Sequence, residues 1–134
     1  MNGLLLPGLR FRRQWLTGGF GLVLVVTILS LVPGEQLPRT GTTDKLNHVL
    51  AYVAMALWFG GIFARRVHVR IALVLLAYGA LIELLQLWMA WGREAELLDL
   101  GADAAGIAAG LMLALTPAGR WAFWVESWQR QSAP

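Results

Sequence analysis

Side chains able to exchange protons gather in the apolar segment that begins at Asp44. Asp44, His48 and Tyr52 are spaced four residues apart, and Lys45 lies three residues before His48. A helix places residues at this spacing on one face. An imidazole beside a carboxylate is suited to general acid–base catalysis, and an ammonium group is suited to binding an anion. The segment therefore predicts a reactive or anion-binding face on an otherwise apolar helix.

Two later apolar segments carry polar pairs at the same helical spacing. Glu83 and Gln86 are three residues apart, and Asp99 and Asp103 are four apart, so each pair shares one face of its helix. A carboxylate inside a membrane helix is costly and normally faces the protein interior or a water-filled cavity. We therefore expect these side chains to meet the polar face of the first segment, with Arg93 closing the site from a loop.

The candidate catalytic pair is His48 and Glu83, with the carboxyl group tuned by burial to give or take a proton. Lys45 and Arg93 are expected to hold an anionic headgroup or phosphate. The candidate substrate-binding residues are Asp44, Lys45, Tyr52, Gln86, Arg93, Asp99 and Asp103. A metal variant would use His48, Glu83 and one of the two aspartates, but no ligand spacing in the sequence supports it. We predict neither a metal nor another cofactor.

Structural roles remain open for most of these residues. Asp44 and Asp99 each begin a segment and would also serve as helix N-caps. Gln86 would serve as a hydrogen bond between helices. Lys45 would also extend from the helix toward the lipid headgroups, and Tyr52 would serve as a packing aromatic. The pair of His48 with Glu83 is the one that structural roles explain least well.

The composition points to lipid rather than water as the solvent of this chain. Its 134 residues are 57% hydrophobic and only 14% charged, with a mean hydropathy of +0.60, whereas an average soluble domain is about 25% charged. There is no cysteine, which excludes disulfide and thiolate chemistry. The net charge is +3. Because the arginines flank apolar segments, membrane headgroups explain this charge better than a nucleic acid partner.

Four apolar segments are each long enough to cross a bilayer as a helix. They predict transmembrane helices at about 15–32, 46–64, 70–91 and 98–116, followed by a short amphipathic, Trp-rich helix at about 119–131 in the membrane interface. The expected fold is all-α: a four-helix transmembrane bundle made by a single domain, residues 1–134. Gly106 and Gly110, with Ala102 one turn earlier, predict that the fourth helix packs closely.

The basic residues predict how these helices cross the membrane. With four alternating spans, one side carries Arg10, Arg12, Arg13, Arg65, Arg66, Arg70, Arg120 and Arg130, and the other carries only Arg39, Lys45 and Arg93. Lysine and arginine near helix ends accumulate on the cytoplasmic side, so we expect both termini in the cytoplasm and His68 solvated at the headgroups. The polar residues then fall in the outer half of the membrane, at most about 12 Å deep, which predicts one outward-facing pocket.

The polar residues, taken in order, resemble the motif set of the VanZ-like family of small membrane proteins. The match consists of Asp44-Lys45-x-x-His48-x-x-x-Tyr52, Glu83-x-x-Gln86 and Arg93-x5-Asp99-x3-Asp103-x2-Gly106, and it extends to about Gly110. The resemblance implies a four-helix fold in the bacterial inner or plasma membrane. Through the family's namesake it also implies a link to resistance to the glycopeptide teicoplanin. The family usually has Asn at the position of Asp103, so this chain has an additional negative charge there.

Three classes of function fit these features. The first is a site that acts on a lipid-linked or cell-envelope substrate from the outer leaflet, with membrane lipids, an envelope precursor or a glycopeptide as partners. The second is binding or assembly without chemistry. The third is a small transporter, which is disfavoured because the inner half of the helices carries no charge and offers no polar route.

Overall fold

The computed structural model describes residues 4–32, 44–89 and 97–131 and shows an all-helical chain. Its elements are α1 (Arg12–Leu31), α2 (Asp44–Ile62), the 3-10 helix η2 (Arg65–Val67), α3 (His68–Met89), α4 (Leu97–Leu115), the 3-10 helix η3 (Pro117–Arg120) and α5 (Trp121–Gln131). These bounds agree with the helices expected from the apolar segments to within about three residues, because the length of an apolar run largely decides where such a helix begins and ends.

Three helical stretches are long and apolar enough to cross a membrane: Arg12–Leu31, Arg65–Met89 and Leu98–Leu115. The helix α2 is of similar length, with 19 residues. Its first turns contain Asp44, Lys45, Asn47 and His48, which lower its mean hydropathy. Length and composition therefore identify a membrane protein with three clear spanning helices, and α2 differs from them by its polar beginning.

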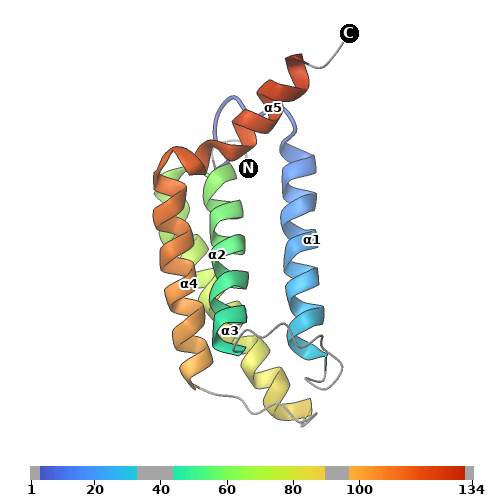
Figure 1. Ribbon diagram of the computed structural model, residues 1–134, viewed down its shortest axis with the longest axis vertical. Coiled ribbons are helices and arrows are strands. Elements are labelled where there is room, and N and C mark those ends of the chain that lie inside the picture. Colours follow the sequence, from blue (N-terminus) through green and yellow to red (C-terminus); the bar gives the residue numbers. More distant parts are fainter. Residues whose placement is uncertain (1–3, 33–43, 90–96, 132–134) are drawn as a thin grey trace.

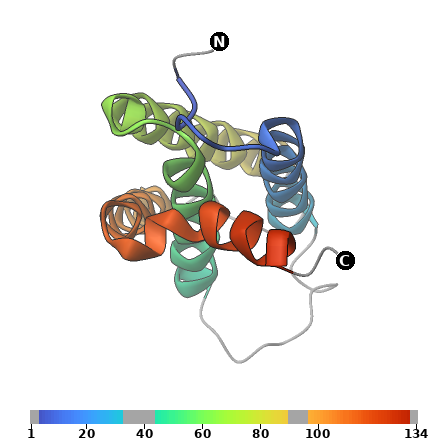
Figure 2. The ribbon, with the colours of Figure 1, turned by 90° about the horizontal axis from the view of Figure 1, so that it is seen from above.

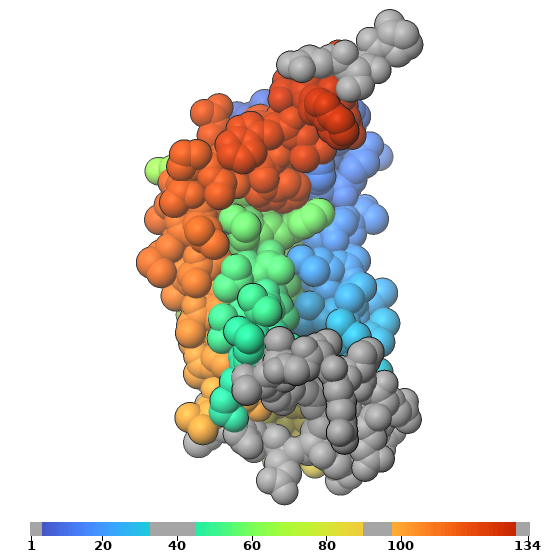
Figure 3. Space-filling view, viewed as in Figure 1, coloured from blue at the N-terminus to red at the C-terminus, as the bar shows by residue number. Residues whose placement is uncertain are grey.

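The four long helices alternate in direction along the chain (Figure 1). Seen from above, α2 lies in the middle, with α4, α3 and α1 around it, and α5 crosses the end of the molecule (Figure 2). We call this end, where α1 and α3 begin and α2 and α4 finish, the α5 end. The space-filling view shows α5 lying over this end and reaching α1 (Figure 3).

The closest packing is between α2 and α4, and two glycines of α4 permit it. Gly106 and Gly110 are both buried. A methyl group added at Gly106 would lie 2.5 Å from the carbonyl oxygen of Val49, and one at Gly110 would lie 2.6 Å from that of Val53. The two backbones therefore touch, as the small-residue ridge predicted.

The core has two parts that differ in chemistry. Its middle is a cluster of aliphatic and aromatic residues in which Met55 and Ala56 of α2 are fully buried. At the α5 end, Trp121 packs edge-on against Trp15 and at a tilt against Trp58, with ring centroids 5.1 and 4.7 Å apart. This second part joins α1, α2 and α5. The outward faces of the spanning helices are instead exposed and apolar, as lipid contact requires.

The prediction that His68 is a solvated surface residue is wrong. His68 begins α3 and is buried, 9% exposed, with Nε2 lying 3.2 Å from the carbonyl oxygen of Gly60 in α2. The imidazole thereby satisfies a carbonyl group in the last turn of α2, close to the tight connection between the two helices. Arg66 and Arg70, which lie beside His68 in the sequence, are exposed, and sequence reasoning therefore took His68 for a surface residue as well.

Candidate functional site

One buried polar residue each of α2, α3 and α4 lies inside the molecule in the half away from α5. His48 is 7% exposed, Glu83 9% and Asp103 1%. Each comes from a different helix. The structure therefore brings these three predicted residues to one place.

A hydrogen bond between His48 and Asp103 forms the centre of this cluster. Nδ1 of His48 lies 2.8 Å from Oδ1 of Asp103, so the imidazole donates through Nδ1 when Asp103 is ionised. The contact joins α2 to α4 one turn from Gly106, where the backbones are closest. A carboxylate in this position fixes the imidazole's orientation and its tautomer, and presents Nε2 as the proton-accepting nitrogen.

Glu83 and Asp99 lie beside this pair. One ligand-type atom from each of His48, Glu83 and Asp99 falls within 4.8 Å of the other two, and all three side chains are buried. Sequence reasoning gave His48 and Glu83 as the acid–base pair and named Asp99 and Asp103 only as candidate substrate-binding residues or metal ligands. The structure adds Asp103 as a direct hydrogen-bond partner and places Glu83 in the surrounding carboxylate group. These are the residue types that would hold a divalent cation in the described part of the chain.

Lys45 and Asp99 form an ion pair at the edge of the cluster. Nζ of Lys45 lies 3.7 Å from Oδ1 of Asp99, and the lysine side chain is 45% exposed while the aspartate side chain is 6% exposed. Asp99 also lies in the first turn of α4, where the helix dipole favours a negative charge. Lys45 therefore reaches from the exposed rim toward the buried carboxylates.

Tyr52 lies beneath the cluster, over a glycine that sequence analysis did not single out. Tyr52 is 3% exposed. A side chain at Gly79 of α3 would collide with both the Tyr52 hydroxyl and the Asp103 carboxylate. The missing side chain at Gly79 thus makes room for two polar groups. The Tyr52 ring also contacts Tyr78, with centroids 6.2 Å apart, at the boundary between the polar cluster and the apolar core.

The remaining predicted site residues have other surroundings or fall outside the description. Nε2 of Gln86 donates a hydrogen bond of 2.8 Å to the carbonyl oxygen of Ser30, so Gln86 links α3 to α1, the interhelical role that the sequence left open. The side chains of Asp44 and Arg93 lie outside the described residues. The structure therefore brings together Lys45, His48, Tyr52, Glu83, Asp99 and Asp103.

Sequence reasoning missed Glu126, which fastens α5 to the beginning of α1. Glu126 is 2% exposed. Its carboxylate accepts hydrogen bonds from the backbone N–H groups of Arg10 (3.0 Å) and Phe11 (3.0 Å) and from the indole of Trp15 (2.8 Å). Burial by itself raises the pKa of Glu126, but the hydrogen bonds from Phe11, Arg10 and Trp15 outweigh it, and the net pKa lies below the ordinary value of 4.5. The sequence signal that could have identified Glu126 is a single acidic residue within the Trp-rich segment that forms α5.

No protein-family model matches this chain, and neither a curated protein nor a solved structure is significantly similar to it.

Proposed function

We propose that this chain is a VanZ-like, multi-pass protein of a bacterial inner or plasma membrane that acts on a lipid-linked or cell-envelope substrate. In this proposal α2 is a fourth transmembrane span and the four long helices form one transmembrane bundle. Both termini and the arginine-rich α5 end face the cytoplasm. The polar cluster then lies in the outer half of the membrane, where envelope precursors and glycopeptide antibiotics are reached.

The observation that carries the proposal is the buried 2.8 Å hydrogen bond between His48 Nδ1 and Asp103 Oδ1 beside Glu83. A histidine oriented by a carboxylate is suited to take a proton from a hydroxyl group or water through Nε2. Glu83 supplies a second acid or base from α3. We assign His48 and Glu83 the acid–base roles, with Asp103 as the positioning residue.

The cation at the rim suggests what the substrate looks like. Lys45 is about half exposed and already directed toward a buried carboxylate, so an anionic headgroup or phosphate that replaces Asp99 as its partner would be drawn to the cluster. Arg93 is assigned the same role from the preceding loop on the sequence alone. The substrate class is therefore an amphiphile with an anionic headgroup, and the link to teicoplanin resistance comes from the family resemblance.

The test compares cells that express the chain with cells that express variants of equal abundance. Lipid-linked envelope precursors are quantified by mass spectrometry of membrane extracts, and teicoplanin susceptibility is measured in parallel. We expect His48→Ala and Glu83→Gln each to reduce the effect of the protein on the precursor pool by about a hundredfold, the usual contribution of a general acid or base. Leu50→Ala, at an exposed position of α2, is the control and should retain it.

A binding protein without chemistry would give a different pattern. It would keep its effect with His48→Asn, which retains a polar group, and would lose it with Lys45→Gln. If both His48→Ala and Glu83→Gln retain full effect, the acid–base assignment is wrong.

One observation favours a second candidate, in which the same cluster uses a divalent cation. One ligand-type atom from each of His48, Glu83 and Asp99 lies within 4.8 Å of the other two. This separation is slightly wider than that of ligands around a bound ion, and small side-chain rotations would bring the atoms closer. Asp103 would then orient a metal-bound imidazole. Metal content of the purified protein decides this: about one equivalent in the wild type and none in Glu83→Gln supports it, and a metal-free active protein excludes it.

A further inference from the structure

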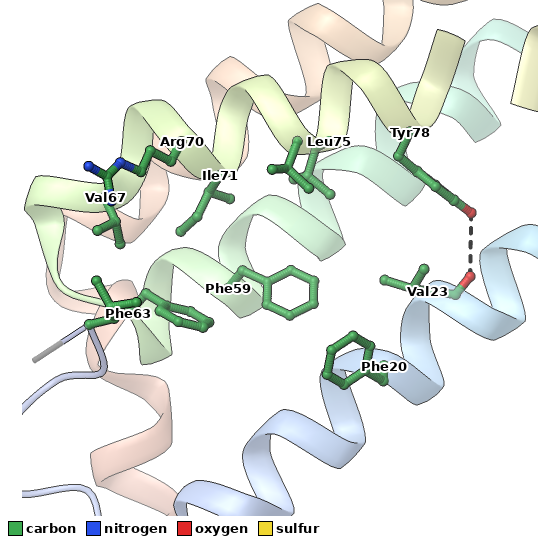
Figure 4. A pocket seen from close by; sticks show the side chains of 11 residues that line it. Phe20, Val23, Phe59, Phe63, Val67, Arg70, Ile71, Leu75 and Tyr78 are labelled. Carbon is green, nitrogen blue, oxygen red and sulfur yellow. Dashed lines mark hydrogen bonds between the residues drawn. The ribbon is translucent and has the colours of Figure 1, made fainter. Parts of the chain in front are cut away.

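An apolar groove lies on the side of the molecule between α1, α2 and α3, apart from the polar cluster. It encloses about 380 Å³. Phe20 and Val23 of α1 form one wall. Phe59 of α2 and Phe63, just after α2, form the floor, and Val67 of η2 together with α3 as far as Tyr78 forms the other wall (Figure 4). Such a volume is typical of small-molecule sites, and its lining here is hydrocarbon and aromatic rings.

Two sets of contacts hold α1 against its neighbours on either side of the groove. Near its beginning, Gly18 and Gly19 receive the rings of Trp58 and Phe59 from α2. Near its other end, Thr27 Oγ1 lies 2.8 Å from the hydroxyl of Tyr78 on α3. The Tyr78 hydroxyl also donates to the carbonyl oxygen of Val23 at 3.4 Å and closes one end of the groove (Figure 4).

Arg70 lies at the opposite end of the groove, near the α5 end of the molecule (Figure 4). Its side chain is exposed, and no carboxylate among the described residues pairs with it. The first turn of α3 is at the same place, and a helix N-terminus favours a negative charge. Eight residues separate Arg70 from Tyr78, which corresponds to about 12 Å along the helix. The groove is thus an apolar channel with a cation at one end.

The rim of the groove faces the membrane. Phe20 is 68% exposed and Val74 66% exposed, and both belong to helical stretches long and apolar enough to span a bilayer. An occupant therefore enters sideways from the lipid phase rather than from water.

We propose that this groove binds one acyl chain of an anionic glycerophospholipid, whose phosphate-containing headgroup pairs with Arg70. A flexible hydrocarbon chain matches an apolar channel of this length, and the unpaired guanidinium at its end selects a headgroup with net negative charge. The lipid belongs to the leaflet next to the α5 end. The site is independent of the polar cluster and of the reaction proposed there.

The test titrates phosphatidylglycerol and phosphatidylcholine with identical acyl chains into the delipidated full-length protein, and native mass spectrometry counts the lipids retained. We expect one phosphatidylglycerol to bind more tightly than phosphatidylcholine. Arg70→Gln should reduce that preference about fivefold, the usual effect of one basic residue near an anionic membrane surface. Arg13→Gln, which removes an exposed arginine of α1 that does not line the groove, should leave it unchanged.

A second pair of variants tests the groove itself. Val74→Trp places a large ring in the groove and should weaken both lipids at least tenfold, because excluding even about two methylene groups has that effect. The control is Leu73→Trp, at a neighbouring position of α3 that is 62% exposed and does not line the groove. Equal binding of the two lipids to the wild type, or equal losses in Val74→Trp and Leu73→Trp, overturns the proposal. The proposal is also overturned if the wild-type protein forms a dimer that retains no lipid and Val74→Trp dissociates that dimer, because a second copy of the chain would then fill the groove.

Discussion

Replacing Glu126 should release the beginning of α1 from α5. In Glu126→Ala the backbone N–H groups of Arg10 and Phe11 and the indole of Trp15 lose their acceptor. An unsatisfied donor costs about 1–3 kcal/mol. Because Arg10 is exposed and Phe11 only half-buried, water replaces part of the loss, and we take the lower limit for each donor. The free energy of unfolding should therefore fall by about 3 kcal/mol.

The isosteric variant and the pH dependence separate charge from shape. Glu126→Gln keeps one acceptor oxygen but turns an NH₂ group toward N–H donors, so it should cost about 1–2 kcal/mol, less than the alanine variant. The pKa of Glu126 is lowered by folding. Its carboxylate therefore stabilises the protein above the unfolded pKa of about 4.5, and this contribution is lost as the pH falls through the folded pKa. The difference in stability between wild type and Glu126→Gln should shrink accordingly below about pH 4.5.

The assay is unfolding in detergent at pH 7 and at acidic pH, followed by tryptophan fluorescence, with hydrogen exchange of the Arg10 and Phe11 amides as a local readout. Both amides should lose protection in Glu126→Ala. Ser127→Ala is the control, because Ser127 Oγ donates only to the nearby carbonyl oxygen of Trp124. If Glu126→Ala unfolds like the wild type, or if the Gln variant shows the same pH dependence as the wild type, the carboxylate does not hold α1 as argued.

Two other changes test the packing around the polar cluster and the groove. Gly106→Ala should destabilise the protein by about 1–3 kcal/mol, because its methyl group would lie 2.5 Å from the Val49 carbonyl oxygen; Gly101→Ala, with no atom within 4 Å, should stabilise it by up to about 1 kcal/mol. Equal shifts of the two unfolding midpoints would contradict the close approach. Tyr78→Phe should cost about 1 kcal/mol by removing the 2.8 Å contact with Thr27, and combining it with Thr27→Val should cost little more; additive losses would contradict a shared hydrogen bond.

The sequence predicted which half of the helices holds the polar residues better than it predicted the partner of each residue. Rise per residue places His48, Glu83 and Asp103 within about 12 Å of the same end of the bundle whatever the details of packing. Which side of each helix faces its neighbours depends on side-chain packing between helices, and no single segment of the sequence determines that packing. Sequence reasoning therefore paired His48 with Glu83, whereas the Asp103 carboxylate, brought close by Gly106, makes the hydrogen bond that the structure shows.

The buried residues that the sequence missed lie where separate segments meet. Glu126 looks like the polar side of an interfacial helix, and His68 looks like one member of a basic turn. Each is buried by another part of the chain: Glu126 by the segment around Arg10, and His68 by the end of α2 at Gly60. Both contacts are made at the beginning of a helix, α1 for Glu126 and α3 for His68, where neither apolar periodicity nor helix length carries information.

The position of α2 explains why, among the four long helices described, it is the one that is not clearly apolar enough to cross a membrane. It contacts α1, α3, α4 and α5, so its side chains face protein more than lipid. A polar face on α2 therefore does not bear the cost that the same residues would bear on α3, whose Leu73 and Val74 are exposed. Hydropathy identifies helices whose side chains contact lipid. A central helix is covered by its neighbours and does not need the same apolar surface. This arrangement lets His48 and Tyr52 occupy the middle of the molecule, and it is why α2 carries the residues on which the proposed chemistry depends.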